Sequence, residues 1–192
     1  MEEVALFLDD HASEVVLLDF NHLCNVSKES HLCLIDKILK RFPSKLCPLT
    51  KVNEVTLNSM SQHGFQLIVF YKNCISRDYP LLWPGCSISS PWPNKHQVQD
   101  LLDTLEENFQ KARDISKFYV SQGVLTPTTC YIICHACKTL KQTLAQTAAR
   151  PFVGWLKPKT AGPNGINICI MDCVELENYV ASVIQLNYSP MQ

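Results

Sequence analysis

The feature that most constrains the fold is an apolar stretch near the start of the chain, from Glu14 to His22, with the sequence EVVLLDFNH. Five apolar residues in an almost unbroken run are typical of a strand that is covered on both faces, as parallel strands in α/β proteins are. The stretch then turns polar, and in barrels of parallel strands the active site lies at the carboxyl ends of the strands. It therefore predicts a buried parallel strand that carries Asp19, Asn21 and His22 at its functional end.

The same pattern recurs three times further along the chain. Apolar runs at residues 66–71, 117–121 and 166–171 are followed by Lys72, Gln122 and Asp172, respectively. Segments with helical periodicity separate the runs, which indicates βα units, right-handed crossovers and a parallel sheet. Because parallel strands end at the same edge of a sheet, we expect these polar side chains to share one cleft.

The remaining elements follow from helical spacing and from turn residues. A short strand is expected at Leu81–Trp83, inside a Pro- and Trp-rich loop over residues 73–97 of the kind that often lines binding sites. Ser30 is expected to cap one helix, Gly64 to end another in the left-handed conformation, and Pro151 to interrupt a third. The predicted helices cover residues 2–10, 31–41, 55–63, 96–114, 126–157 and the segment after Asp172.

With 192 residues and 46% hydrophobic content, the chain can bury a substantial core, so we expect a single α/β domain over residues 1–192. A closed eight-stranded (β/α) barrel normally needs about 250 residues. The predicted strands therefore leave two interpretations, an open α/β sheet or a partial TIM-like barrel that lacks its first strands.

Charge and composition exclude several classes of protein. The net charge is −1, with 17 basic and 18 acidic residues, so no overall field favours nucleic acid or an anionic membrane. No apolar run approaches the roughly 20 residues that span a bilayer, and the acidic N-terminus is unlike a secretory signal. We therefore expect a cytoplasmic protein whose ten cysteines are reduced and buried as small hydrophobic residues.

The polar residues after the strands are the main candidates for chemistry. Carboxylates, an imidazole and an ammonium group that face one cleft could bind phosphate, hold a divalent cation or transfer protons. The alternative is that some of them cap helices or pair with each other. The candidates are Asp19, Asn21, His22, Lys72, Asp172 and, with the weakest case, Gln122. We interpret His11, His31, His63 and His96 as solvated residues at helix ends.

A cysteine motif, Cys130-x3-Cys134-x2-Cys137, is similar in spacing to the cluster motif of radical S-adenosylmethionine enzymes. Its surroundings favour a helix, however, whereas three thiolates around one cluster need a loop. Zinc binding lacks a nearby second pair of ligands. We therefore expect no metal at this motif.

Five segments and two shorter ones resemble the phosphatidylinositol-specific phospholipase C X domain-containing proteins, in the short form that has only the X domain. The segments are residues 14–22, 35–38, 68–73, 79–84, 120–127, 165–168 and 172–176. The resemblance implies a distorted TIM barrel and cleavage of a phosphodiester, in which one histidine acts as general base and a second protonates the leaving oxygen.

The resemblance also assigns roles to residues of this chain. It places Lys72 near the phosphates or the inositol of the substrate and Asp172 where an acid can orient the first histidine. With Asp19, Asn21, His22 and Trp83 it implies a binding site for a phosphoinositide or related phospholipid head group. Phe20 occupies the position of a glutamate that ligates calcium in calcium-dependent relatives, so we expect no cofactor, with calcium as the alternative.

The Pro-Gly-Ser-His-Asp segment that carries the first catalytic histidine of this family is absent from the sequence. We therefore expect the chain to be the C-terminal part of the barrel, a truncated isoform that is a phosphoric diester hydrolase by family but lacks both catalytic histidines. The alternative is a non-catalytic module that binds phosphoinositide or protein. We expect peripheral membrane contact, no binding of nucleic acid, and self-association if the barrel is open.

Overall fold

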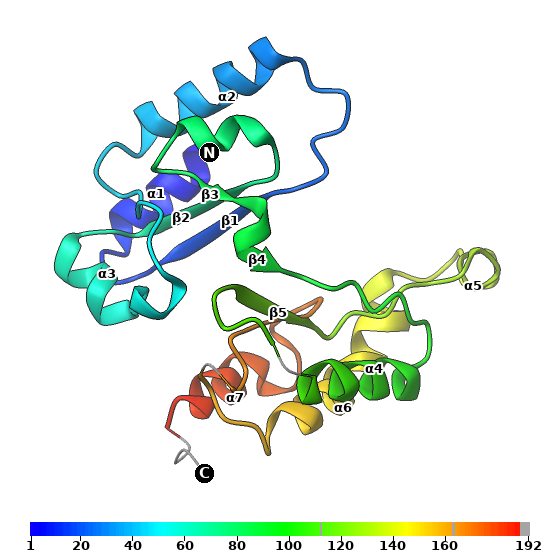
Figure 1. Cartoon of the computed structure of the whole chain (residues 1–192). Helices are drawn as coiled ribbons and strands as arrows, with labels where there is room; N and C mark the ends of the chain where they lie inside the picture. The colour runs from blue at the N-terminus through cyan, green and yellow to red at the C-terminus, as the bar shows by residue number, and fades with distance from the viewer. Residues whose placement is uncertain (112, 163, 189–192) are drawn as a thin grey trace. The chain divides into compact units, whose positions relative to one another are not determined.

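The computed structural model describes residues 1–111, 113–162 and 164–188, and the chain divides into two compact units (Figure 1). The units are Met1–Ile88 and Ser89–Gln192, and each is described by itself. Both contain parallel strands and helices, which confirms the predicted α/β class. The prediction of a single domain over residues 1–192 stays a prediction.

The sheet of the first unit is parallel, with the strand order β1-β2-β3. These strands are Val16–Phe20, Leu67–Tyr71 and Trp83–Pro84, close to the predicted positions. Helices α1 (Glu2–Asp10) and α2 (Lys28–Arg41) pack their buried residues in one cluster with the side chains that alternate along β2. The helices of this cluster therefore cover one face of the sheet.

The prediction that the first strand is covered on both faces is wrong. Along β1, Leu17 is 38% exposed and Asp19 is exposed, whereas Leu18 and Phe20 pack partly buried against the core cluster. The reason is that β1 is an edge strand, since its partner among the described residues is β2. Its second edge has no neighbouring strand in this unit, and the face that carries Leu17 is covered at β2, where Ile68 and Phe70 are buried, but not at β1.

The helix ends of the first unit follow capping rules, with one correction. The N-cap of α2 is Ser27 rather than the predicted Ser30, and the Ser27 hydroxyl accepts a hydrogen bond from the Ser30 amide at 3.2 Å. Helix α3 (Leu57–His63) begins after Thr56, whose hydroxyl caps it. The predicted left-handed end of α3 is confirmed, because Gly64 has a φ of 70°.

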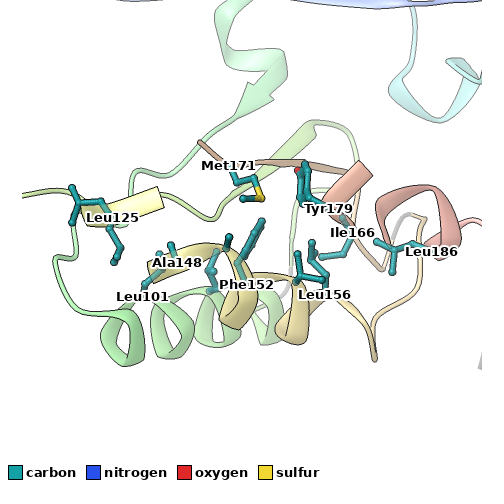
Figure 2. Packing of buried hydrophobic residues seen from close by; sticks show 13 residues of the cluster. Leu101, Leu125, Ala148, Phe152, Leu156, Ile166, Met171, Tyr179 and Leu186 are labelled. Atoms are coloured by element: carbon teal, nitrogen blue, oxygen red, sulfur yellow. The ribbon is translucent and has the colours of Figure 1, made fainter. Parts of the chain in front are cut away.

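The second unit contains the parallel pair β5 (Phe118–Gln122) and β6 (Ile168–Ile170) and the helices α4 (Val98–Gln110), α6 (Gln146–Leu156) and α7 (Tyr179–Leu186). The helices and strands enclose a cluster of buried residues (Figure 2). Phe152 is fully buried in this cluster and points towards Met171. Its ring also lies against the backbone of Gly123, where a Cβ atom would come within 2.3 Å of it. Gly123 therefore allows the end of β5 to approach α6.

The predicted helix over residues 126–157 is three shorter segments. They are α5 (Thr129–Cys134), a π-helical turn at Lys141–Ala145, and α6. The predicted interruption at Pro151 is wrong, because Pro151 lies inside α6. Its neighbours Ala148, Ala149 and Phe152 are buried in the core cluster, and this packing offsets the hydrogen bond that proline cannot donate.

The other short elements connect these segments. They are β4 (Ile88–Ser89) and the 3-10 turns Val52–Glu54, Cys74–Asp78, Gly85–Ser87 and Leu176–Asn178. Within the described ranges, no helix combines the length and the apolar character needed to cross a lipid bilayer.

Candidate functional site

Three of the predicted site residues form a chain of hydrogen bonds at the end of β1. The amide nitrogen of Asn21 donates to the Asp19 carboxylate at 2.8 Å, and the amide oxygen of Asn21 accepts from Nδ1 of His22. Because an amide oxygen can only accept, Nδ1 of His22 carries the proton in this arrangement. In the neutral form of this imidazole, the Nε2 atom of the exposed His22 has a lone pair, as a general base or an acceptor requires.

The backbone holds His22 in an uncommon conformation. Its φ is 40°, in the left-handed region that few residues other than glycine adopt, although asparagine, aspartate and histidine adopt it more often than the rest. The His22 carbonyl accepts a hydrogen bond from the Cys24 amide at 2.8 Å, which closes the turn after β1. Strained residues of this kind cluster at functional sites.

Lys72 lies at the same edge of the sheet. Its amide donates to the Phe20 carbonyl at 3.0 Å, and Asp19 is in register with Phe70. Paired residues share a face and side chains alternate along a strand, so Lys72 is on the same face as Asp19. Gly85 passes close to this lysine, since a Cβ atom on Gly85 would lie 2.8 Å from that of Lys72. The structure therefore brings Asp19, Asn21, His22 and Lys72 to one edge.

A cavity of about 490 Å³ lies in the first unit beside this edge, between the start of α2 and the segment after β2. It is lined by Lys28, His31, Asn73, Cys74 and Asp78, together with two apolar side chains. His31 is 4% exposed, so its interpretation as a solvated helix-end residue is wrong. The spacing of His31 with the buried Ile35 and Ile38 is helical, and this sequence signal could have identified it.

The tautomer of His31 follows from its neighbours. The Asn73 amide oxygen accepts from the Ile75 backbone at 3.1 Å, and its nitrogen donates to Nε2 of His31 at 3.2 Å. Nδ1 of His31 therefore donates to the Tyr71 hydroxyl at 2.8 Å. Burial raises the pKa of Tyr71, which keeps this phenol neutral. His31, Tyr71 and Asn73 thus form a satisfied hydrogen-bond network beside the cavity, whose wall also carries the charged Lys28 and Asp78.

Trp83, predicted to contact substrate, is fully buried. Its indole N–H donates to the Cys47 carbonyl at 3.0 Å, and its ring meets that of Phe70 edge to face at 6.0 Å. These contacts make Trp83 a packing residue in this structure. A role in substrate binding stays a prediction, and the burial does not support it.

The two predicted site residues of the second unit differ from each other. Gln122 is buried, and its amide nitrogen contacts the Ser90 carbonyl at 3.1 Å, the Ser90 hydroxyl at 3.0 Å and the Pro91 carbonyl at 3.0 Å. Asp172 is half-buried and follows β6. Because each unit is described by itself, the predicted cleft shared by Asp19, Lys72 and Asp172 stays a prediction.

The cysteines are free thiols, but most are not buried as expected. Seven are exposed and one, Cys47, is buried. Cys130 and Cys134 lie on α5, in agreement with the helix that was predicted there. Within the described ranges, no three His, Cys, Asp or Glu side chains are placed to hold a metal ion. The Phe20 ring contacts that of Tyr71 in a tilted arrangement, with ring centroids 5.8 Å apart, on the face opposite to Asp19.

These observations define an α/β protein in which parallel strands present an acid–amide–imidazole chain and a lysine at one edge. Among curated proteins, PI-PLC X domain-containing protein 3 of Mus musculus is 34% identical over 188 residues, which are 98% of this chain and 59% of that protein. PI-PLC X domain-containing protein 2 of Mus musculus is 36% identical over 96% of this chain and 54% of its own length. The human PI-PLC X domain-containing protein 1 is 28% identical over 97% of this chain.

The chain is therefore a homologue of the PI-PLC X domain-containing proteins, which confirms the resemblance carried by its motifs. It spans between about half and three fifths of the length of these relatives. No protein-family model matches the chain. No solved structure matches it either.

Proposed function

We propose that this chain forms part of a TIM-like barrel of the phospholipase C X type that binds the phosphodiester head group of a phosphoinositide. The names of the relatives and the parallel strands with polar ends support this proposal. The observation that carries it is the Asp19–Asn21–His22 hydrogen-bond chain beside Lys72. An ammonium group suits a phosphate oxygen, and an imidazole with a free Nε2 suits a hydroxyl or water proton.

The same residues indicate which groups for phosphodiester cleavage this chain would provide. Cleavage of a phosphodiester by acid–base chemistry needs a base for the attacking hydroxyl and an acid for the leaving oxygen. At this edge the chain offers one imidazole, and the sequence has no Pro-Gly-Ser-His-Asp segment. We therefore propose that the chain alone binds the head group but cleaves phosphatidylinositol no faster than buffer does.

The proposal also covers the cofactor and the partner. Phe20 is directed to the helix-covered face, so we propose that this position supplies no calcium ligand and that binding is independent of metal. The partner would be a phospholipid head group at the cytoplasmic surface of a membrane. Asp172 would have a supporting role only if the complete barrel placed a histidine beside it.

Titration of the chain with inositol 1-phosphate by isothermal calorimetry, with and without EDTA, tests the binding. Lys72→Gln should weaken binding by about tenfold, the expected loss for one charge-assisted hydrogen bond. Lys37→Gln is the matched control, because Lys37 is exposed on α2 and lies away from this edge. His22→Gln, with His63→Gln as its control, tests the imidazole.

Equal binding by the wild type and Lys72→Gln would refute the proposed site. Release of inositol phosphate from phosphatidylinositol vesicles by the purified chain would refute the proposed lack of catalysis instead. If that release persisted in His22→Gln, His22 would have no role in the chemistry.

A further inference from the structure

A second cavity lies in the second unit, beside the start of β5, and Ser89 and Pro91 form part of its wall. Its volume is about 300 Å³, and it lies between the end of α4 and the start of β5. Three cationic side chains and one carboxylate line it, which leaves an excess of two positive charges. The charged residues are Lys111, Arg113, Asp114 and Lys117, and Asn108 and Tyr119 add polar groups.

The carboxylate in this cavity is already paired. Asp114 lies 3.0 Å from the Lys117 ammonium, and the Ser116 backbone amide donates to it at 3.0 Å. Hydrogen bonds from Ser116 and from Lys117 hold the pKa of Asp114 at about 2, so it stays ionised and neutralises Lys117. In the described part of the chain, Lys111 and Arg113 have no carboxylate within ion-pair distance. Among the described residues, the Lys111 ammonium has the Asn108 amide oxygen as its hydrogen-bond partner, at 3.5 Å.

Arg113 is held in place by contacts that leave its charge without a counter-ion. Its guanidinium carbon lies 5.0 Å from the ring centre of Tyr119 and 5.4 Å from that of Phe109. One of its nitrogens donates to the Gly165 carbonyl. No side chain would fit at Gly165, because a Cβ atom there would lie 2.0 Å from the Thr160 oxygen. A half-buried charge of this kind costs free energy that a bound anion would offset.

We propose that this cavity is a binding site for a phosphate-bearing anion, with Arg113 as the main hydrogen-bond donor and Lys111 as a second cation. A guanidinium plane matches the geometry of phosphate oxygens, and an excess of two positive charges matches a phosphate dianion. The phosphate could belong to a soluble anion or to a lipid head group. The site is built from residues other than those at the end of β1, so it does not rest on the proposed function.

The test uses the full 192-residue chain and two probes. Binding of inorganic phosphate is measured by calorimetry, and co-sedimentation is measured with vesicles of phosphatidylcholine, with or without phosphatidylinositol 4-phosphate. Arg113→Gln should weaken phosphate binding by about tenfold or more. Lys111→Gln should weaken it by less, and it provides a second test if Arg113→Gln does not fold. Arg150→Gln is the matched control, because Arg150 is exposed on α6 and pairs with Glu177.

Loss of phosphate binding in Arg113→Gln or Lys111→Gln, but not in Arg150→Gln, would support the site. Co-sedimentation with the phosphoinositide vesicles that is lost in the same variants would identify the lipid as a source of the phosphate. Phosphate binding without co-sedimentation would identify the soluble anion. Absence of binding to both probes, or equal losses in all three variants, would overturn the proposal.

Discussion

At the end of β1, Asp19 and His22 are exposed, and Lys72 is exposed at the end of β2. At the end of β5, Gln122 is buried, and its amide contacts Ser90 and Pro91. The polar groups of the first unit are thus available to a ligand, whereas Gln122 in the second unit is used to hold a loop. A polar residue after a buried strand therefore indicates a site only when the neighbouring loop leaves it unoccupied.

The largest expected effect tests the dependence of the second unit on its aromatic core. Phe152→Ala removes a fully buried ring from the cluster of Figure 2 and should lower the free energy of unfolding by about 3–5 kcal/mol. Urea denaturation followed by tryptophan fluorescence measures this loss. Phe7→Ala in the first unit is the control, since Phe7 is 42% exposed and its loss should cost much less. Similar losses for both variants would contradict the importance of this core.

The next effect concerns the hydrogen bonds of His31 with Tyr71 and Asn73 in the first unit. His31→Phe replaces the imidazole with a larger apolar ring and leaves the Tyr71 hydroxyl and the Asn73 amide without their partner, which should cost about 2 kcal/mol. His63→Phe is the control, because His63 is exposed at the end of α3. Thermal unfolding of both variants measures the difference. A neutral His31→Phe would show that these hydrogen bonds add little to stability.

A smaller effect depends on pH and lies in the second unit. The Glu106 carboxylate accepts from Lys159 at 2.6 Å and from the Trp155 indole at 2.8 Å, and hydrogen bonds, that from Lys159 foremost, lower its pKa from 4.5 to about 2. The stabilisation is therefore complete above pH 4.5 and is lost as the pH falls towards 2. Because the Glu106 side chain is 41% exposed, we expect about 1 kcal/mol or less.

Glu106→Gln should remove this contribution at neutral pH and flatten the dependence of stability on pH below 4.5. Urea unfolding at several pH values measures it, with Glu107→Gln on the same helix as the control. If the wild type and Glu106→Gln differ by the same amount at all these pH values, the ionised carboxylate is not the source of the stability.

The positions of the main strands and of most helices could be predicted because they depend on local apolar runs and spacing. The burial of Leu17 and Leu18 could not be predicted, because it depends on how many elements flank β1. The sequence of the strand does not specify that number. The interruption predicted at Pro151 is wrong for a similar reason, since the packing of α6 outweighs the low helix propensity of proline.

The candidate site was predictable in its members but not in its connections. Asp19, Asn21 and His22 are adjacent in sequence, so their proximity is expected, whereas the hydrogen-bond chain depends on the left-handed turn at His22. No pattern in the sequence indicates the cavity beside Arg113. It forms because Arg113, which follows α4, contacts Tyr119 and Gly165 from other segments.

The smallest effect on stability is expected for a substitution on the open edge of the first unit. The same substitution should clearly change self-association of the chain. Leu17→Lys places a charge on the exposed face of β1, which should change the free energy of unfolding by less than about 0.5 kcal/mol. A lysine on an edge strand opposes pairing with a second chain, so self-association should decrease. Leu32→Lys on α2 is the matched control, because Leu32 is also 38% exposed. Sedimentation velocity over a range of concentrations measures association, and a monomeric wild type would show that the edge of β1 does not pair.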